Sequence, residues 1–429
     1  MVLQKNAERA YFIFLYALAA LLPTFFFIAP ILIVLIGLSW LALIYKQSFN
    51  NIKNAPKIVW VFIIFYVLHV LSYFISANKP QASFELEQKL GFLLLPIFVG
   101  SGPVIDNKRL SNLFIFYIFG ISAVAITCFT NAGIIWYKSH TYNQFFYHQL
   151  VHIFSANAIY NSVYTLFSLS LLMLYNWPGS GIFKNKILYT LLFIIQIIFL
   201  LLLSSKTVIL LFALILVPLY IMKINKQHKI TWVQLTPFAF ITVLLALVLF
   251  TNNPIKTRYK QITKYNQTSY WIPEKENQQQ QFNHLTIRLF LWKIAIENII
   301  ENKLYLYGSG SGDVQDLQKK KILIYEKRFD PDRNTNQLCD LNIHNQILQT
   351  FFMLGFVGLL IVIYILITPF FWTCNDGIKN IIIVFNLSYI FLAMQESVFQ
   401  TQAGVIYYLF MYFIFYNYCS NNVKKEVVY

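Results

Sequence analysis

Residues 345–367 read NQILQTFFMLGFVGLLIVIYILI and follow a single histidine, His344. This segment has no charged side chain and is longer than the ~20 apolar residues that a helix needs to cross a bilayer. The 92 residues before the histidine, 252–343, are polar overall. The sequence therefore predicts an imidazole at a membrane surface, where a large water-facing loop meets a membrane span.

The rest of the chain is apolar in the same way. Its 429 residues are 58% hydrophobic and 12% charged, whereas soluble domains carry about 25% charged residues. Apolar runs of span length recur along the chain. We therefore predict an all-α polytopic membrane protein with about 12 transmembrane helices. Pro23 and Pro30 interrupt the long apolar run that holds the first two, and the fourth is short and carries Pro96. The predicted spans lie near 10–28, 30–46, 57–76, 88–103, 110–131, 156–175, 186–204, 206–222, 231–250, 345–367, 379–395 and 402–420.

The positions of lysine and arginine predict the orientation of the chain. With the N-terminus inside, the short inner segments hold 15 of these residues and the short outer segments hold 4. Short cytoplasmic loops carry the excess of positive charge in membrane proteins, whereas long loops do not follow this rule. We therefore expect both termini in the cytoplasm, spans 1–9 within residues 1–251, a large helical periplasmic loop at 252–343, and spans 10–12 within residues 344–429.

Charge and cysteine content argue against two other kinds of site. The net charge of +16 does not predict nucleic-acid binding, because about half of the basic residues are topology signals beside an anionic leaflet. The long loop holds 14 basic and 10 acidic residues and is only mildly cationic. The four cysteines are scattered, so their spacing predicts neither a disulfide framework nor a zinc site. They are Cys128, Cys339, Cys374 and Cys419.

A helix is predicted in the second half of the long loop, over residues 285–300 (LTIRLFLWKIAIENII). It is too short and too charged to span, so we expect it on the bilayer surface or packed over the bundle. Arg288 lies one turn before Trp292, on the polar edge of this helix. The apolar residues at helical spacing are Leu285, Leu289, Trp292, Ile296 and Ile299.

A glycine-rich turn, YGSGSGD (307–313), follows this helix, and Asp313 is a suitable N-cap for a second helix over 313–327. A glycine-rich loop that opens a helix can bind phosphate through its backbone N–H groups. No strand precedes this one, and the spacing of a dinucleotide-binding loop is absent. A plain tight turn is therefore the favoured interpretation, with phosphate binding as the alternative.

Three short motifs follow one another in the second half of the chain. They are R-x-x-x-W with G-x-G-x-G-D, then H-N-x-x-L-Q with G-x-x-G-L, and then ESVFQTQAGVIYYLF (396–410). Their order beside a long outer loop resembles the O-antigen ligase and polymerase superfamily of bacterial envelope glycosyltransferases. The matching residues of the first two motifs are Arg288, Trp292, Gly308, Gly310, Gly312, Asp313, His344, Asn345, Leu348, Gln349, Gly355, Gly358 and Leu359.

The resemblance implies a membrane glycosyltransferase of the bacterial inner membrane with a periplasmic active face. Its donor would be a glycan on undecaprenyl pyrophosphate, and its acceptor a sugar hydroxyl, in the first place on lipid A–core. An O-antigen polymerase and a protein O-oligosaccharyltransferase are alternatives within the superfamily. A lipid-linked oligosaccharide flippase or transporter is the alternative of another class. The nearly charge-free spans disfavour it, because transporters carry buried charges at the membrane midplane.

The resemblance and the residue chemistry together predict the site. His344 is the candidate general base, because imidazole titrates near neutral pH, and anchoring of a helix start is its plain alternative. Arg288 and Lys206 are candidate ligands of the donor pyrophosphate. The plain alternatives are a surface arginine and a snorkelling lysine. The family often has arginine where this chain has Lys206, which keeps the charge but loses the bidentate fork. The supporting residues are Asn345, Glu396, Gly310 and Gly312.

Glu396 lies in a nearly charge-free region, and an acid near membrane depth usually has a partner, here Arg288, Lys206 or His344. One base and a good leaving group imply a single displacement with inversion. No acidic D-x-D pair is visible in an outer loop, so we expect the reaction to need no metal and no other cofactor. The outer segment 136–154 holds three histidines among aromatic residues. Its spacing indicates a metal site only weakly and favours sugar-stacking or interfacial aromatic side chains. The three are His140, His148 and His152.

Overall fold

The computed structural model describes residues 2–23, 27–44, 56–175, 185–225, 284–329 and 336–426. Within these ranges all regular elements are helices, and no strand occurs. By length and composition, five helical stretches in these ranges can cross a membrane, so the chain is a helical membrane protein. They are α4 (Lys57–Ile75), α7 (Asn107–Ser139), the run of α12, η4 and α13 (Lys206–Asn225), α19 with η6 (Gln346–Phe371), and α20 (Asp376–Ala393).

Other helices coincide with further predicted spans but are shorter or more polar. The fourth prediction, 88–103, corresponds to α6 (Gly91–Leu95) and the π-helix η1 (Pro96–Gly100), because Pro96 has no N–H to continue the α-helical pattern. The predicted ninth span, 231–250, lies outside the described residues, so the total of 12 stays a prediction. The remaining elements of this group are α1 (Val2–Leu21), α2 (Ala29–Ile44), α9 (Ala158–Leu174), α11 (Lys186–Leu202) and α21 (Gln402–Glu426). The short helix α5 (Lys79–Gln88) lies between the third and fourth predicted spans.

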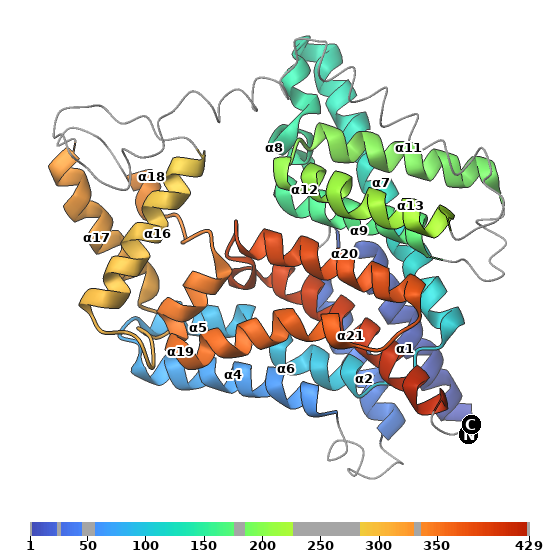
Figure 1. Cartoon of the computed structure of the whole chain (residues 1–429), viewed down its shortest axis with the longest axis horizontal. Coiled ribbons are helices and arrows are strands. Elements are labelled where there is room, and N and C mark those ends of the chain that lie inside the picture. Colours follow the sequence, from blue (N-terminus) through green and yellow to red (C-terminus); the bar gives the residue numbers. More distant parts are fainter. Residues whose placement is uncertain are drawn as a thin grey trace.

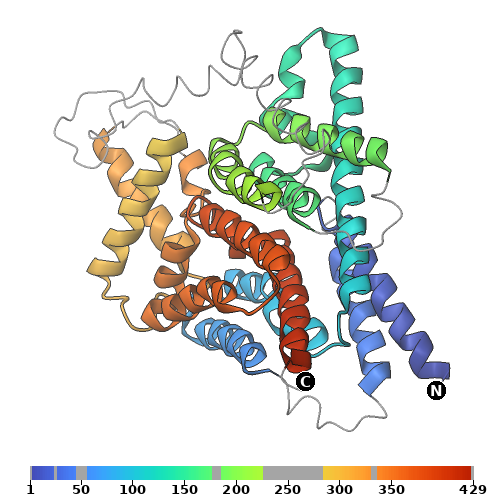
Figure 2. The same ribbon diagram turned by 45° about the vertical axis from the view of Figure 1, so that its right-hand side comes forward.

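The core of the bundle is aromatic and centres on α21, whose residues 404–415 are all buried. Its Tyr408 ring stacks on Tyr389 of α20, with the ring centroids 4.3 Å apart. Figures 1 and 2 show the ends labelled N and C at one end of the molecule, with α16 (His284–Glu301) and α17 (Val314–Phe329) at the other. The described half of the predicted outer loop therefore lies far from the termini.

The two helices predicted in the long loop are confirmed as α16 and α17, but the predicted apolar face of α16 is only partly buried: Ile299 is 2% exposed and Trp292 packs against the core. Ile296 on that face is 38% exposed, whereas Leu291 and Ile294 are fully buried. The reason is that α16 packs between two neighbours, α17 on one side and α19 on the other. Leu291 and Ile294 form a small core with Ile322 of α17, and spacing within one helix cannot indicate a second neighbour.

The tenth predicted span is broken inside α19, at Gly355, which has φ 66° and ψ −159°. Such a break leaves backbone groups without their helical partners. The turn after α16 supplies partners to both sides of the break. Phe356 donates its N–H to Tyr305 O (2.7 Å), and Ser309 donates to Phe352 O (2.8 Å). The glycine-rich turn therefore packs backbone to backbone against α19, which only glycines with positive φ permit here.

This close packing makes Gly310 sensitive to substitution. Gly310 has φ 92°, and an added Cβ would overlap the Ser76 side chain of the α4–α5 connection. We expect Gly310→Ala to destabilise the protein by about 1–3 kcal/mol and to lower its melting temperature in detergent. Gly133→Ala is the matched control, because a Cβ there meets nothing within 4 Å and the site is helical. An equal melting temperature for both variants would contradict this packing.

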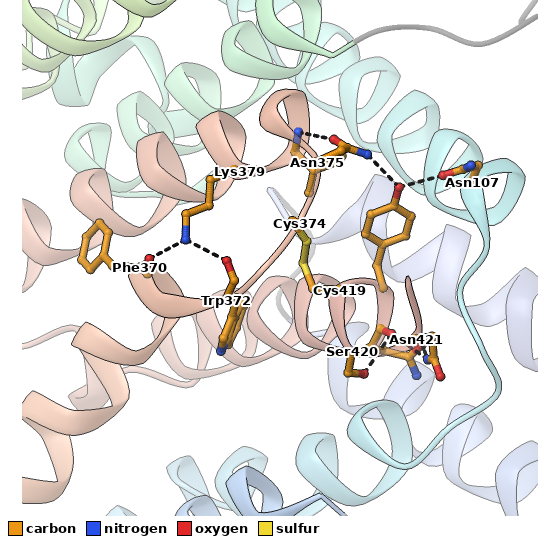
Figure 3. The surroundings of a disulfide bond; sticks show 12 residues. Asn107, Phe370, Trp372, Cys374, Asn375, Lys379, Cys419, Ser420 and Asn421 are labelled. Carbon is orange, nitrogen blue, oxygen red and sulfur yellow. Dashed lines mark hydrogen bonds between the residues drawn. A yellow bond between two sulfur atoms is a disulfide. The ribbon is translucent and has the colours of Figure 1, made fainter. Parts of the chain in front are cut away.

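A disulfide joins Cys374, before α20, to Cys419, near the end of α21. The sequence spacing predicted no such bond, and that prediction was wrong. The cysteines are 45 residues apart in the sequence, but α20 and α21 form a hairpin that brings the chain back to the end at which α20 begins. Figure 3 shows the surrounding polar contacts, in which the Tyr418 hydroxyl donates to Asn107 (2.7 Å) and accepts from Asn375 (3.2 Å). The bond ties the hairpin at the end opposite its 394–401 turn.

Candidate functional site

His344, Arg288 and Glu396 come together from distant parts of the sequence. Glu396 Oε1 lies 2.7 Å from Nη2 of Arg288, and Oε2 lies 2.9 Å from Nδ1 of His344. Each carboxylate oxygen therefore faces its own partner. The Glu396 side chain is 9% exposed, whereas those of Arg288 and His344 are 19% and 22% exposed. The buried carboxylate thus holds two partners that remain accessible. We call these three residues the His–Glu–Arg cluster.

Three separate elements place the cluster. His344 immediately precedes α19, and Asn345 is the N-cap of that helix, its Oδ1 accepting the N–H of Leu348 (3.0 Å). His344 itself has φ 51°, a left-handed conformation that is uncommon for a residue with a Cβ. Its N–H donates to Asn342 Oδ1 (3.0 Å), which holds the backbone in this state. Strained backbone of this kind is concentrated at functional sites.

The other two members come from α16 and from the turn between α20 and α21. Arg288 lies in the second turn of α16. The Glu396 N–H donates to Leu392 O (2.8 Å), so the residue is fixed at the end of α20. The buried Gln346 joins the first turn of α19 to the same turn, because its Oε1 accepts the N–H of Phe399 (2.7 Å). The cluster therefore sits where the long loop meets the bundle.

The electrostatics of the cluster fix the protonation of its carboxylate. Burial raises the pKa of Glu396, but the hydrogen bond and charge of His344 and the charge of Arg288 outweigh burial, so the pKa lies below its ordinary value. Glu396 is therefore ionised at neutral pH and can only accept hydrogen bonds. A neutral His344 then carries its proton on Nδ1, and Nε2 is left to accept a proton. A carboxylate orients and supports a histidine base in the same way in Ser-His-Asp enzymes.

Lys206 begins α12 (Lys206–Leu211), directly after Ser205. Its neighbour Thr207 accepts a hydrogen bond from the side chain of Gln395, with 2.6 Å between Oγ1 and Nε2. Gln395 is the residue before Glu396. The start of α12 therefore packs against the turn that carries the Glu396 carboxylate, and Lys206 lies at the same end of the bundle as the cluster.

The predicted supporting glycines have a structural use. Gly310 donates its N–H to Met353 O (3.1 Å), and Gly312 donates to Ser76 Oγ (3.0 Å). The Asp313 carboxylate accepts the N–H groups of Ala77 and Asn78, both at 2.8 Å. These two glycine N–H groups are therefore engaged within the chain. The tight-turn interpretation fits this geometry better than a phosphate cradle does.

The three histidines of segment 136–154 lie apart from the cluster, on the hairpin that follows α7. His148 belongs to the single turn α8 (Tyr147–Leu150), and its Nδ1 accepts the N–H of Ala158 (3.3 Å). His152 begins a separate 3-10 turn, η3 (His152–Phe154), so these two do not share a helix face. His140 is exposed at the end of α7. Within the described ranges, no group of three metal-ligating side chains occurs.

Lys89 and Glu85 were missed as site residues in the sequence. Lys89 reads there as a topology signal, but its side chain is 1% exposed and paired with Glu85 of α5. Its Nζ also donates to Gln400 Oε1 (3.1 Å). Gln400 lies four residues after Glu396 in the sequence. The spacing of four residues between Glu85 and Lys89 is the signal that could have indicated a pair. Nothing in the sequence indicates their contact with Gln400.

One comparison with known proteins matches the chain. Residues 191–363 match a family model described as O-antigen ligase, and no curated protein matches the chain. The matched range contains Lys206, Arg288, His344 and Asn345 and ends before Glu396. The carboxylate that joins Arg288 to His344 is thus a feature that the structure adds to the family match.

Proposed function

Because residues 191–363 match a family model described as O-antigen ligase, we propose that this membrane protein is a glycosyltransferase of the ligase type. It moves a glycan from undecaprenyl pyrophosphate to a sugar hydroxyl of lipid A–core at the periplasmic face of the inner membrane. The single observation that supports this proposal best is the His–Glu–Arg cluster, which places a base and a cation on one buried carboxylate.

The proposed reaction is one displacement at the anomeric carbon. Nε2 of His344 takes the proton of the acceptor hydroxyl, whose oxygen forms the new bond to that carbon. The bond from the carbon to the pyrophosphate breaks, and the pyrophosphate leaves with the electron pair. Glu396 stabilises the imidazolium that forms. Arg288 gives one N–H to Glu396, and its other donors are suited to the leaving pyrophosphate.

The cationic residues supply the next prediction. Arg288→Ala and Lys206→Ala should each lower transfer about 10- to 150-fold, since a charge-assisted contact to phosphate contributes about 1.5–3 kcal/mol. Lys206→Arg should retain activity, because the positive charge persists. The measurement is the rate of transfer from lipid-linked glycan by purified variants. Both alanine variants working at the parental rate would exclude these residues as pyrophosphate ligands.

The proposed location can be tested by cysteine labelling. In a chain without native cysteines, Gln279→Cys should react with a membrane-impermeant thiol reagent in cells whose outer membrane alone is permeabilised. Residue 279 lies in the predicted periplasmic loop and outside the described residues. Lys186→Cys, at the start of α11 and predicted to be cytoplasmic, is the control and should react only after lysis. The reverse pattern would overturn the topology.

The alternatives differ in acceptor. A deletion strain that loses all long O-chains but keeps its lipid A–core indicates a ligase, whereas a single repeat on the core indicates a polymerase. Loss of a glycosylated protein alone indicates a protein O-oligosaccharyltransferase. A flippase or transporter would show no transfer by the purified protein in detergent. The cluster at one end of the bundle favours an enzyme over a translocation path.

A further inference from the structure

A second feature of the same end of the molecule is a cavity of about 300 Å³ beside the cluster. Its walls come from α5, the glycine-rich turn, the start of α17, the segment before α19, and Gln349 and Gln400. Asn342, which accepts the N–H of His344, is one of its lining residues. The cavity therefore adjoins the candidate base through a single residue. Its volume is at the small end of the ~300–1,000 Å³ typical of ligand pockets.

Three residues that line this cavity carry buried polar atoms without partners in the described ranges. Ser311 and Gln349 are 3% and 5% exposed, yet Ser311 Oγ and Gln349 Oε1 have no hydrogen-bond partner within the described part of the chain. The Oε1 atom of Gln400 accepts a hydrogen bond from Lys89, whereas the Nε2 atom of Gln400 has no partner among the residues that the structure describes. Buried polar groups are normally hydrogen-bonded, and each exception calls for a ligand or a structural reason. These three atoms, one hydroxyl, one amide oxygen and one amide nitrogen, belong to residues that line one cavity.

The chemistry of the lining selects the ligand. Among the described residues that line the cavity, Glu85 and Asp340 carry carboxylates and none is a lysine or arginine. Lys89 compensates the Glu85 charge, so a phosphate or pyrophosphate would meet the Asp340 carboxylate. Hydroxyl groups, in contrast, donate readily to carboxylates and amide oxygens. Phe84 adds an apolar ring at the rim and is 53% exposed. Amides, a serine, carboxylates and one aromatic ring together suit a small, uncharged, hydroxyl-rich ligand.

We infer that this cavity binds one uncharged sugar ring next to the reacting bond. The inference rests on the proposed function, because the cavity adjoins His344 and the substrates there would be glycans. The ring comes either from the lipid-linked donor or from the lipid A–core acceptor, and both present the same hydroxyl chemistry. The cluster and the cavity then bind different groups, with the pyrophosphate at Arg288 and a sugar ring at Gln349.

Photo-crosslinking in cells tests binding without relying on catalysis. p-Benzoylphenylalanine is placed at Phe84 in the His344→Ala chain, in cells that make the lipid-linked glycan and the core. Irradiation should give an adduct that carries glycan. Mild acid, which cleaves the sugar–pyrophosphate bond, releases the polyprenyl pyrophosphate from a donor adduct, and an antibody to lipid A detects an acceptor adduct. The control position is Phe371, 78% exposed at the opposite end of α19.

Variants of the lining test the hydrogen bonds. Gln349→Leu and Ser311→Ala should each weaken the adduct and raise the KM for one substrate about 2- to 12-fold in the otherwise parental enzyme, with kcat nearly unchanged. The substrate whose KM rises identifies the source of the ring. Gln149→Leu, on the exposed hairpin after α7, is the control. If Gln349→Leu fails to fold, Ser311→Ala and the parental crosslink still decide the question.

The outcomes separate this inference from the proposed function. A glycan adduct at position 84 that the two variants weaken supports the sugar site. Absence of any glycan adduct at position 84, or unchanged KM values in both variants, overturns it, even if the parental enzyme transfers glycan. A glycan adduct together with no transfer by the purified parental protein would overturn the proposed function and leave the sugar site standing.

Discussion

His344→Ala is expected to abolish transfer while the protein remains folded and still binds its lipid donor. Removal of a general base typically lowers a rate about 10²- to 10⁴-fold. His344→Gln should fail as well, because an amide keeps the size and polarity of the side chain but cannot take up the proton. The measurement is transfer of lipid-linked glycan by the purified variants, with donor binding and melting temperature followed in parallel.

His152→Ala is the matched control for this loss. It removes an exposed histidine from the other predicted outer segment and leaves the cluster untouched, so activity should stay at the parental level. An active His344→Ala protein would show that the imidazole is not the base. Loss of activity together with a large fall in melting temperature would show that His344 has only a structural role, at the start of α19.

Glu396→Gln should have the second largest effect. The neutral amide can no longer stabilise the imidazolium, and it can donate to Nδ1 and so favour the wrong tautomer. The corresponding change in Ser-His-Asp proteases lowers kcat about 10⁴-fold, which we take as an upper bound. Glu396 acts here as a positioning residue, and the measurement is kcat/KM for transfer by the purified variant.

The ionised Glu396 carboxylate should also make the stability of the folded protein depend on pH. The folded state lowers the pKa of Glu396, so its contribution to stability is present above the ordinary carboxyl pKa of ~4.3 and is lost as pH falls through the folded value. The difference in stability between the parental protein and Glu396→Gln should therefore be constant near neutral pH and shrink below about pH 4. A difference that is independent of pH down to that range would contradict the ionised cluster.

Much of this molecule could be predicted from the sequence because membrane spans and helix signals are local. Apolar length indicates the spans, and the spacing of 285–300 and 313–327 indicates α16 and α17, which the structure confirms. His344 and Asn345 lie at the predicted helix start. The rarity of acids near membrane depth predicts that Glu396 pairs with Arg288, Lys206 or His344, and the structure brings it into contact with Arg288 and His344.

What the sequence could not indicate depends on contacts between distant segments. The buried face of α16 follows from its position between α17 and α19. The break at Gly355 persists because the turn after α16 bonds to the freed backbone groups, and no motif states that pairing. The bond between Cys374 and Cys419 depends on a hairpin of 45 residues. The cavity beside Asn342 is formed by segments that lie far apart in the sequence, and none of them predicts it alone.

The most direct test is a double-mutant cycle on the cluster, measured as single-turnover transfer from lipid-linked glycan to extracted lipid A–core by the purified protein. If Glu396 acts only through His344, the double variant with His344→Ala and Glu396→Gln should transfer glycan at the rate of His344→Ala alone, within about threefold. The reason is that the effects of residues that act as a unit do not add. Multiplied losses in the double variant, or near-parental transfer by His344→Ala, would contradict a histidine base held by this carboxylate.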